Sequence, residues 1–437
     1  MDARSLVLGG GGIPRPADVT VAPGTHNLPR PPEKVFVGRE EAAAQLDAGL
    51  ADDGSVVLTQ AVVGLGGVGK SGLALQYAHA QRQRYSLTWW ITAEDPAQVE
   101  SGLAALAGRL CPEQALAATT TEAAEWAVTW LQAHPGWLLI LDDVSEAAQV
   151  EPLLGQLHGG HVVLTTRRDT GWERIATQVW LDMLDPVPAT AFITAMTRPS
   201  NPEETQAAAD IAAELGYLPL ALDQAIAYIV QARVPTVRYL DLLREHPVRM
   251  YAATAAGDSV QRTIARLWDI TLEAIGRANP AGVHLLRILA CYASDNIPRR
   301  ILGGEDGGPD VNEALALLAS YSMITLTADS VSLHKLVQAV ILAAPGDVSD
   351  IPPPRAVALK WIHDALPPRP QQAVAAWPFL RVISPHAEAI VAQYLPADEP
   401  AAVAYVLNEI GLFYNSQGDY LGALRLQTVS LEITRRH

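Results

Sequence analysis

Residues 64–71 form a glycine-rich loop, Gly-Leu-Gly-Gly-Val-Gly-Lys-Ser, that ends in a lysine and a hydroxyl side chain. An apolar stretch, 55–63, precedes this loop, and a stretch of helical character, 72–80, follows it. In a strand–loop–helix setting, glycines let successive backbone N–H groups turn toward phosphates, which also face the positive end of the helix dipole. The loop therefore predicts a binding site for a nucleoside triphosphate.

The residues of the loop have distinct expected roles. Lys70 is predicted to reach the terminal phosphates and to act in catalysis, and the hydroxyl of Ser71 is predicted to bind Mg²⁺. The predicted nucleotide contacts from the loop and the start of the helix are Gly64, Gly66, Gly67, Val68, Gly69, Lys70, Ser71 and Gly72.

A dinucleotide-binding loop is the main alternative for this segment. The glycines also satisfy the pattern G-x-G-x-x-G, and Glu94 follows at about the distance of a ribose ligand. That pattern does not call for Lys-Ser after its last glycine, so the phosphate loop is the favoured interpretation. The glycine run at 9–12 has no preceding strand and is interpreted as part of a flexible leader.

Two adjacent carboxylates, Asp142 and Asp143, end the apolar run 138–141. In a phosphate-loop fold this strand is expected beside the loop, so that both carboxylates emerge at the phosphate end. Asp142 is predicted to hold Mg²⁺, through water, and Asp143 to orient or deprotonate the attacking water. The alternative is that both are ordinary strand-end or capping residues.

An arginine follows the next apolar run, which ends in Thr165-Thr166. Arg167 is predicted to reach the terminal phosphate and to act in hydrolysis. Two alternatives stay open: Arg167 is a surface residue paired with a neighbouring acid, or the adjacent Arg168 has the role instead.

Composition bounds the class of protein. A chain of 437 residues has room for two to four domains, and 49% hydrophobic residues are enough for sizeable cores. The apolar runs are far shorter than the ~18 residues of a membrane span, and the first residues lack a basic region followed by an apolar stretch, so secretion is not expected. Cys111 and Cys291 have no metal-binding spacing, so a reduced, cytoplasmic protein is expected. A net charge of −16 makes nucleic acid an unlikely partner for the whole surface.

The pattern along the chain changes from alternating strands and helices to helices alone, which predicts a doubly wound parallel sheet followed by helical domains. The strand-like runs are 55–62, 86–92, 136–142 and 161–166, and the helical stretches near them are 39–51, 72–85, 97–107 and 121–132. The expected parts are a flexible leader (1–34), a phosphate-loop nucleotide-binding domain (35–184), a helical domain (185–278), a winged-helix domain (279–348), a helical linker region (349–402) and a repeat-like hairpin (403–437).

The last of these parts has the periodic pattern of a tetratricopeptide (TPR) unit. Gly411 and Ala423 stand where two helices approach closely in such units, although Gln427 and Ser430 depart from the usual residue types. An ordinary helical hairpin is the alternative. Because repeat units stabilise one another by stacking, a single unit predicts an array that continues beyond this sequence.

Six motifs in order give the chain a resemblance to the NB-ARC branch of the STAND ATPases over residues 34–345. These motifs are Phe36-Val37-Gly38-Arg39-Glu40, the loop 64–71, the acidic strand end 138–144, Thr165-Thr166-Arg167, Gly216-Tyr217-Leu218-Pro219-Leu220 and residues 333–338, Leu-His-Lys-Leu-Val-Gln. The resemblance implies a nucleotide-binding α/β domain, a small helical domain, a winged-helix domain and then a repeat sensor.

The resemblance also implies roles for individual residues outside the loop. The backbone at Phe36 and Val37 would contact adenine, with Arg39 near the nucleotide. Pro219 would pack on the base or ribose, and His334 would reach the β-phosphate of ADP and lock a closed state. Each has a plainer alternative: Arg39 supports the first helix, Pro219 starts a helix, and His334 is an ordinary strand-end histidine. Lys335 departs from the family pattern, which often has Asp there.

The function expected from this resemblance is an ADP/ATP-controlled switch with slow ATP hydrolysis. It would be monomeric and closed with ADP, and it would form a homo-oligomer after an unknown signal, read by the repeats, leads to ATP exchange. Three alternatives remain: a continuously cycling ATPase, a scaffold with a structural nucleotide, and a transcription regulator that uses its winged helix.

Overall fold

The computed structural model describes residues 14–33, 35–50, 58–63, 67–112, 118–168, 171–245, 259–303, 309–343, 353–394 and 401–436, with the backbone alone at 58–63, 259–266, 309, 336, 343 and 436. The predicted glycine leader at 9–12 and the first loop residues, Gly64 to Gly66, lie outside these ranges. The chain divides into two compact units, with the main boundary after Asp182. Each unit is described by itself.

A parallel six-stranded sheet forms the centre of the first unit, in the order β1-β3-β4-β5-β2-β6. Its strands are β1 (Thr25–His26), β2 (Leu58–Val63), β3 (Leu87–Thr92), β4 (Trp137–Val144), β5 (His161–Thr166) and β6 (Thr177–Trp180). The predicted parallel sheet is confirmed. The acidic strand β4 and the loop strand β2 are not neighbours in the sheet, because β5 pairs with both of them and separates them.

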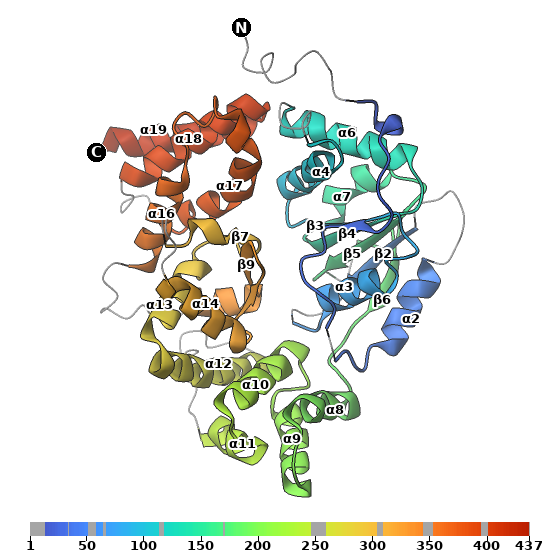
Figure 1. The fold of residues 1–437 in the computed structure, drawn as a ribbon, viewed down its shortest axis with the longest axis vertical. Helices are drawn as coiled ribbons and strands as arrows, with labels where there is room; N and C mark the ends of the chain where they lie inside the picture. Colours follow the sequence, from blue (N-terminus) through green and yellow to red (C-terminus); the bar gives the residue numbers. More distant parts are fainter. Residues whose placement is uncertain are drawn as a thin grey trace. The chain divides into compact units, whose positions relative to one another are not determined.

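Helices cover both faces of this sheet (Figure 1). On one face lie α4 (Pro96–Leu110), α6 (Thr120–Ala133) and α7 (Ala147–Leu154), and on the other lie α2 (Glu40–Gly49) and α3 (Lys70–Ala80). Successive side chains of a strand point to opposite faces. Leu139 and Leu141 of β4 accordingly join the core under α4 and α6, while Leu138 and Ile140 are buried on the opposite face.

Residues 14–33 are held along the first unit, which differs from the predicted flexible leader. The indoles of Trp126 and Trp130 on α6 donate hydrogen bonds of 2.7 Å to the carbonyls of Pro14 and Val19. Asn27 exchanges two hydrogen bonds with the backbone of Trp90, next to the pairing of β1 with β3. Polar contacts to backbone, more than apolar burial, hold this segment, so a search for hydrophobic periodicity does not reveal it.

The second unit begins with helices, as the sequence predicts after about residue 185. They are α8 (Pro186–Thr197), α9 (Pro202–Glu214), α10 (Pro219–Ala232), α11 (Thr236–Glu245) and α12 (Ser259–Ala278). The buried amide of Gln224 on α10 accepts a hydrogen bond from the indole of Trp268 on α12 and donates one of 3.5 Å to the carbonyl of Ser322. This amide therefore ties the helices to the next segment of the chain.

That segment combines helices with a small antiparallel sheet in the order β7-β9-β8. Its elements are α13 (Pro280–Ala290), β7 (Ile297–Pro298), the 3₁₀ turn Arg299–Ile301, α14 (Pro309–Ser320), β8 (Ile324–Leu326), β9 (Ser330–Leu333) and α15 (Lys335–Ala343). β8 and β9 form an antiparallel hairpin, and β7 pairs with the other edge of β9.

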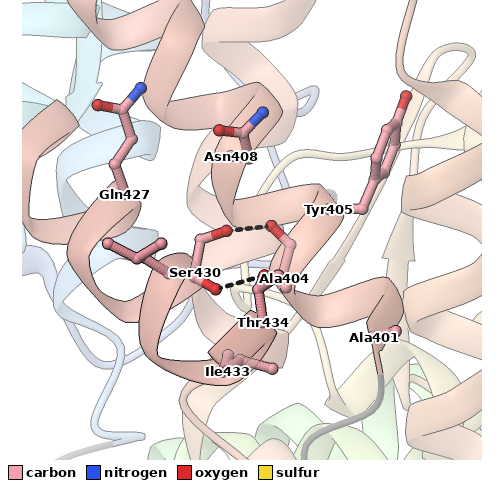
Figure 2. Close-up of a pocket in the computed structure, with 9 residues that line it drawn as sticks. Ala401, Ala404, Tyr405, Asn408, Gln427, Ser430, Ile433 and Thr434 are labelled. Carbon is pink, nitrogen blue, oxygen red and sulfur yellow. Dashed lines mark hydrogen bonds between the residues drawn. The ribbon is translucent and has the colours of Figure 1, made fainter. Parts of the chain in front are cut away.

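The remaining helices are α16 (Pro354–Ala365), α17 (Trp377–Val391), α18 (Ala401–Gln417) and α19 (Tyr420–Arg436), with a 3₁₀ turn at Val374–Ala376. α18 and α19 form a hairpin whose backbones approach closely at Gly411, where an added Cβ would lie 2.8 Å from Gln427. Figure 2 shows a pocket between these two helices, with the hydroxyl of Ser430 donating a 2.7 Å hydrogen bond to the carbonyl of Ala404. The small residues expected at this contact, Gly411 and Ala423, allow the two helices to approach closely.

Among the helices in the described part of the chain, none combines the length and the apolar character needed to cross a bilayer.

Candidate nucleotide and metal site

The end of the glycine-rich loop leads directly into helix α3, which begins at Lys70. Gly67 and Gly69 have φ angles of 84° and 96°, a region that residues with a Cβ rarely adopt. Gly69 is the N-cap of α3, so the helix starts immediately after this turn, and its first backbone N–H groups have no partner within the helix. The predicted residues Gly67, Val68 and Gly69 thus form a turn suited to an anion.

Lys70 is buried, with 8% of its side chain surface exposed. Burial and, to a smaller extent, the positive charge of Arg167 lower the pKa of its ammonium group to about 8, against the opposing effect of Asp143 and Asp142. Lys70 therefore lies within electrostatic range of Arg167 and of both aspartates. A partly desolvated ammonium group of this kind gains much from a phosphate partner.

Ser71 and Asp142, the two predicted Mg²⁺ ligands, lie in contact. The Ser71 hydroxyl donates a hydrogen bond of 2.7 Å to Oδ1 of Asp142, and the hydroxyl of Thr165 donates one of 2.5 Å to the same oxygen. A hydroxyl and a carboxylate at the start of a helix provide hard oxygen ligands, which Mg²⁺ prefers and completes with water and phosphate oxygens. These residues therefore fit the predicted metal, although β4 and β2 are not neighbours.

A β-bulge places Asp143 in the same site as Asp142. The pairing of β4 with β5 shifts between Leu141 and Val144, and Asp143 has a φ angle of 62°. Its backbone N–H donates a 2.8 Å hydrogen bond to the hydroxyl of Thr165. In a regular strand the two adjacent carboxylates would point to opposite faces, whereas the extra residue of the bulge redirects one of them.

The two adjacent arginines after β5 point to different partners. Arg167 forms an ion pair with Asp143, with an Nε–Oδ1 distance of 3.3 Å, while Arg168 pairs with Glu146 at 3.0 Å. Arg167 is thus the arginine at the carboxylates. Its ion pair with Asp143 matches the alternative of pairing with a neighbouring acid, and its predicted contact with the terminal phosphate stays a prediction.

Arg39 is buried and forms a hydrogen bond to the backbone of the loop. Its guanidinium donates hydrogen bonds of 2.7 Å to the carbonyls of Val68 and Asp182, so it joins the loop to the end of the first unit. Phe36 and Val37 are half-buried just before Gly38, whose φ angle is 69°. Their predicted contacts to adenine remain predictions, as does any contact of Arg39 with the nucleotide.

Gly72, in the first turn of α3, faces the segment before α2. A Cβ added there would lie 3.6 Å from the carboxylate of Glu33, which pairs with Arg30 at 3.1 Å. The same segment is fixed by His79 of α3, whose ring nitrogen hydrogen-bonds the carbonyl of Arg30 at 2.8 Å. Gly72 thus lies where residues 30–33 pass close to the helix.

The two remaining predicted contacts belong to the second unit. Pro219 is the first residue of α10, the position where proline is favoured, after a turn in which Gly216 and Tyr217 have φ angles of 60° and 57°. His334 is exposed between β9 and α15, and its carbonyl accepts the N–H of Gln338 at 3.0 Å. Their contacts with nucleotide stay predictions.

The strand order excludes the dinucleotide alternative. In a dinucleotide-binding fold, the acidic ribose ligand ends the strand next to the glycine-loop strand. Glu94 follows β3, and both β5 and β4 lie between β3 and the loop strand β2.

Sequence analysis missed the contribution of Thr165. It grouped this threonine with Arg167 as a motif but assigned a role only to the arginine. A hydroxyl residue just before a predicted site residue at a strand end is a weak signal, because Thr is common in strands.

Comparisons with known proteins identify a domain of this chain and several relatives. Residues 39–179 match the model of the NB-ARC domain. The chain is 24% identical to a nucleotide-binding leucine-rich repeat (NLR)-like protein of Hyaloscypha variabilis, over 92% of this chain and 44% of that protein. It is 29% identical to the regulatory protein AfsR of Streptomyces griseus, over 64% of this chain and 28% of that protein. The chain thus spans less than half the length of these curated relatives.

A solved structure has the same fold over most of the chain. It is the signal transduction ATPase with numerous domains (STAND) with a tetratricopeptide repeat sensor from Pyrococcus horikoshii, with a TM-score of 0.51 and 14% identity, covering 92% of this chain and 59% of that one. The loop, the acidic strand and the matching residues lead to one conclusion: residues 39–179 of this chain are an NB-ARC domain.

Proposed function

We propose that this protein is a signalling switch controlled by ADP and ATP, with slow ATP hydrolysis that resets it. The observation that carries the proposal is the cluster at the start of α3, where Lys70 and the Ser71–Asp142 pair lie beside the Asp143–Arg167 pair. Phosphate binding alone requires only the loop and its lysine. Hydrolysis also requires two carboxylates with separate partners: one holds the metal and the other orients the water.

Each side chain has a defined task in the proposed reaction. Lys70 and the N-terminus of α3 bind the phosphates, and Ser71 and Asp142 hold Mg²⁺, which when bound neutralises phosphate charge. Asp143 orients the attacking water and accepts its proton. Arg167 pairs with Asp143 before ATP binds, and we expect it to turn to the γ-phosphate afterwards, which releases the carboxylate for its role as base.

In the closed state we propose that Pro219 packs on the nucleoside and His334 binds the β-phosphate of ADP. His334 directly follows β9, so a displacement of this strand also displaces the histidine. The N–H of Leu333 donates to the carbonyl of Ser294 at 2.7 Å, and the N–H of Asn296 donates to the Ser332 hydroxyl at 3.0 Å. The loop 291–296 is thereby fastened to β9.

Helices α16 and α17 hold the same loop from the other direction. Gln393, two residues after the end of α17, donates a 2.8 Å hydrogen bond to the carbonyl of Cys291, and a ring nitrogen of His386 on α17 lies 3.2 Å from the carbonyl of Asn296. The hydroxyl of Tyr292 donates to the carbonyl of Ala358 on α16 at 3.2 Å. These contacts support the proposal that a movement of the C-terminal helices reaches His334 through a continuous set of hydrogen bonds.

The signal itself is proposed to act on the C-terminal hairpin as the first unit of a repeat sensor. One face of α19 is apolar and exposed, with Leu421, Leu424 and Leu431 at 82%, 64% and 50% exposure. Their helical spacing places them on one side, which is how a repeat unit presents itself to a neighbour. ATP exchange would then favour an open, oligomeric form, and ADP the closed monomer.

The nucleotide content of the purified protein tests the switch. The protein is denatured, and the supernatant is separated by anion-exchange chromatography. Near-stoichiometric ADP is expected, because a closed state retains the product. An empty site, or ATP that exchanges rapidly and is turned over steadily, would contradict the closed switch and favour the continuously cycling ATPase.

Replacing His334 with alanine is expected to speed ADP release, because the closed state loses its contact with the β-phosphate. Stopped-flow displacement of a fluorescent ADP analogue measures the rate, with an increase of about tenfold for one charge-assisted hydrogen bond. His158→Ala, at an exposed histidine of the first unit, is the control. ADP affinity and release that match the wild type in H334A would argue against the latch.

A further inference from the structure

The position of both site carboxylates depends on one irregularity of strand β4. The bulge at Asp142 and Asp143 interrupts the backbone ladder with β5, and it leaves Asp143 in a left-handed conformation that is uncommon for a residue with a Cβ. A conformation of this kind persists only where the surroundings hold it in place. The contacts that hold it therefore decide where the carboxylates point.

Thr165 contacts both residues of the bulge, Asp142 and Asp143. Its hydroxyl donates to Oδ1 of Asp142 and accepts the N–H of Asp143, so a single buried oxygen connects both residues to β5. Thr166 closes the other end of the bulge, where its hydroxyl donates a 2.7 Å hydrogen bond to the carbonyl of Val144. Hydroxyls thus take the place of the missing ladder bonds, but only the hydroxyl of Thr165 reaches a carboxylate.

We infer that Thr165 is a positioning residue that holds Asp142 against the metal site and turns Asp143 toward Arg167 and the attacking water. The part of this inference that concerns hydrolysis rests on the proposed function. The part that concerns Asp142 and Mg²⁺ does not, because it requires only that nucleotide binds together with the metal. Loss of an outer hydrogen bond to a metal ligand typically reduces metal affinity or activity by about 10- to 100-fold.

Thr165→Val tests the inference, because valine keeps the shape and suits a buried strand while it removes the hydroxyl. Thr165→Ser restores the hydroxyl, and Thr166→Val removes the neighbouring hydroxyl, which contacts no carboxylate among the described residues. For each variant, a fluorescent ADP analogue is titrated with and without Mg²⁺, single-turnover ATP hydrolysis is measured, and thermal unfolding confirms that the protein is folded.

For T165V we expect unchanged ADP affinity without Mg²⁺, and an Mg²⁺ requirement raised by about 10- to 100-fold. Single-turnover hydrolysis should fall by a similar factor, and T165S should behave like the wild type. T166V should lower the unfolding temperature and leave the Mg²⁺ requirement unchanged.

Two results would overturn the inference: an unaltered Mg²⁺ requirement in T165V, or an equal change in T166V. A wild-type protein that binds Mg²⁺-nucleotide without hydrolysing it would refute the proposed ATPase instead. The Mg²⁺ titration would then still decide the role of Thr165 at Asp142.

Discussion

Replacing Lys70 with alanine is expected to abolish nucleotide binding at micromolar protein concentrations. The ammonium group is buried at the start of α3, and the phosphates would lose their principal cationic partner. Removing one partner of a buried, hydrogen-bonded charge pair reduces affinity on the order of 100-fold or more. Isothermal titration with ADP and ATP in the presence of Mg²⁺ measures the loss.

A surface lysine provides the matched control for this variant. Lys360 is 70% exposed and pairs with Asp364 on the same helix, so Lys360→Ala removes an equal charge without touching the loop. Unchanged affinity is expected for K360A. Tight nucleotide binding by K70A would contradict the assignment of the loop.

The pH dependence of nucleotide affinity shows which protonation state of Lys70 binds the nucleotide. The pKa of Lys70 in the free protein is lowered to about 8, first by burial and then by Arg167. Below that value the lysine is already charged when nucleotide arrives. Above it, binding must take up a proton, so the affinity of the wild type should fall by about tenfold per pH unit until the raised pKa of the complex is reached. A wild-type affinity that stayed constant as the pH rises above 8 would contradict this role of the Lys70 charge.

Asp143→Asn is expected to stop hydrolysis while nucleotide still binds. A general base contributes about 10²- to 10⁴-fold to such rates, and an amide cannot accept the proton. Binding should persist because Asp142, not Asp143, contacts Ser71. Single-turnover assays with radiolabelled ATP measure the rate, and the same samples give the ATP retained. In the proposed switch, D143N should therefore accumulate with ATP and form oligomers.

Glu146→Gln is the control for this change, because Glu146 pairs with Arg168 just beyond the same strand and contacts none of the proposed site residues in the described part of the chain. E146Q should hydrolyse ATP at the wild-type rate. If D143N did so too, Asp143 would not be the base. A D143N variant that failed to bind ATP would show that this carboxylate has a role in binding instead.

Local motifs could be predicted well from the sequence, because their chemistry depends on neighbours in the chain. The glycine loop requires only that a strand precede it and a helix follow, and α3 does begin at Lys70. Apolar runs likewise marked β3, β4 and β5, since a buried parallel strand is apolar on both faces. The contact between Ser71 and Asp142 could be expected from these motifs. The strand order that brings the two residues together could not.

The order of the strands and the direction of single side chains were decided by the tertiary structure. Nothing local distinguishes a β4 beside β2 from a β4 separated from it by β5, because both arrangements bury the same apolar residues. β1 escaped prediction for a related reason: Asn27 and the indoles of α6 hold its surroundings through hydrogen bonds that no hydrophobic pattern records.

The sequence by itself predicted a phosphate-binding loop at residues 64–71 and two carboxylates at the end of a buried strand. Only the tertiary structure decided that Asp143 shares a site with Asp142, and that Arg167 rather than Arg168 faces it. The physical reason is that a regular strand alternates its side chains between two faces, so adjacent residues meet in one site only where the strand is irregular. That irregularity is held by the hydroxyl of Thr165 on a different strand, a contact 22 residues away in sequence from Asp143.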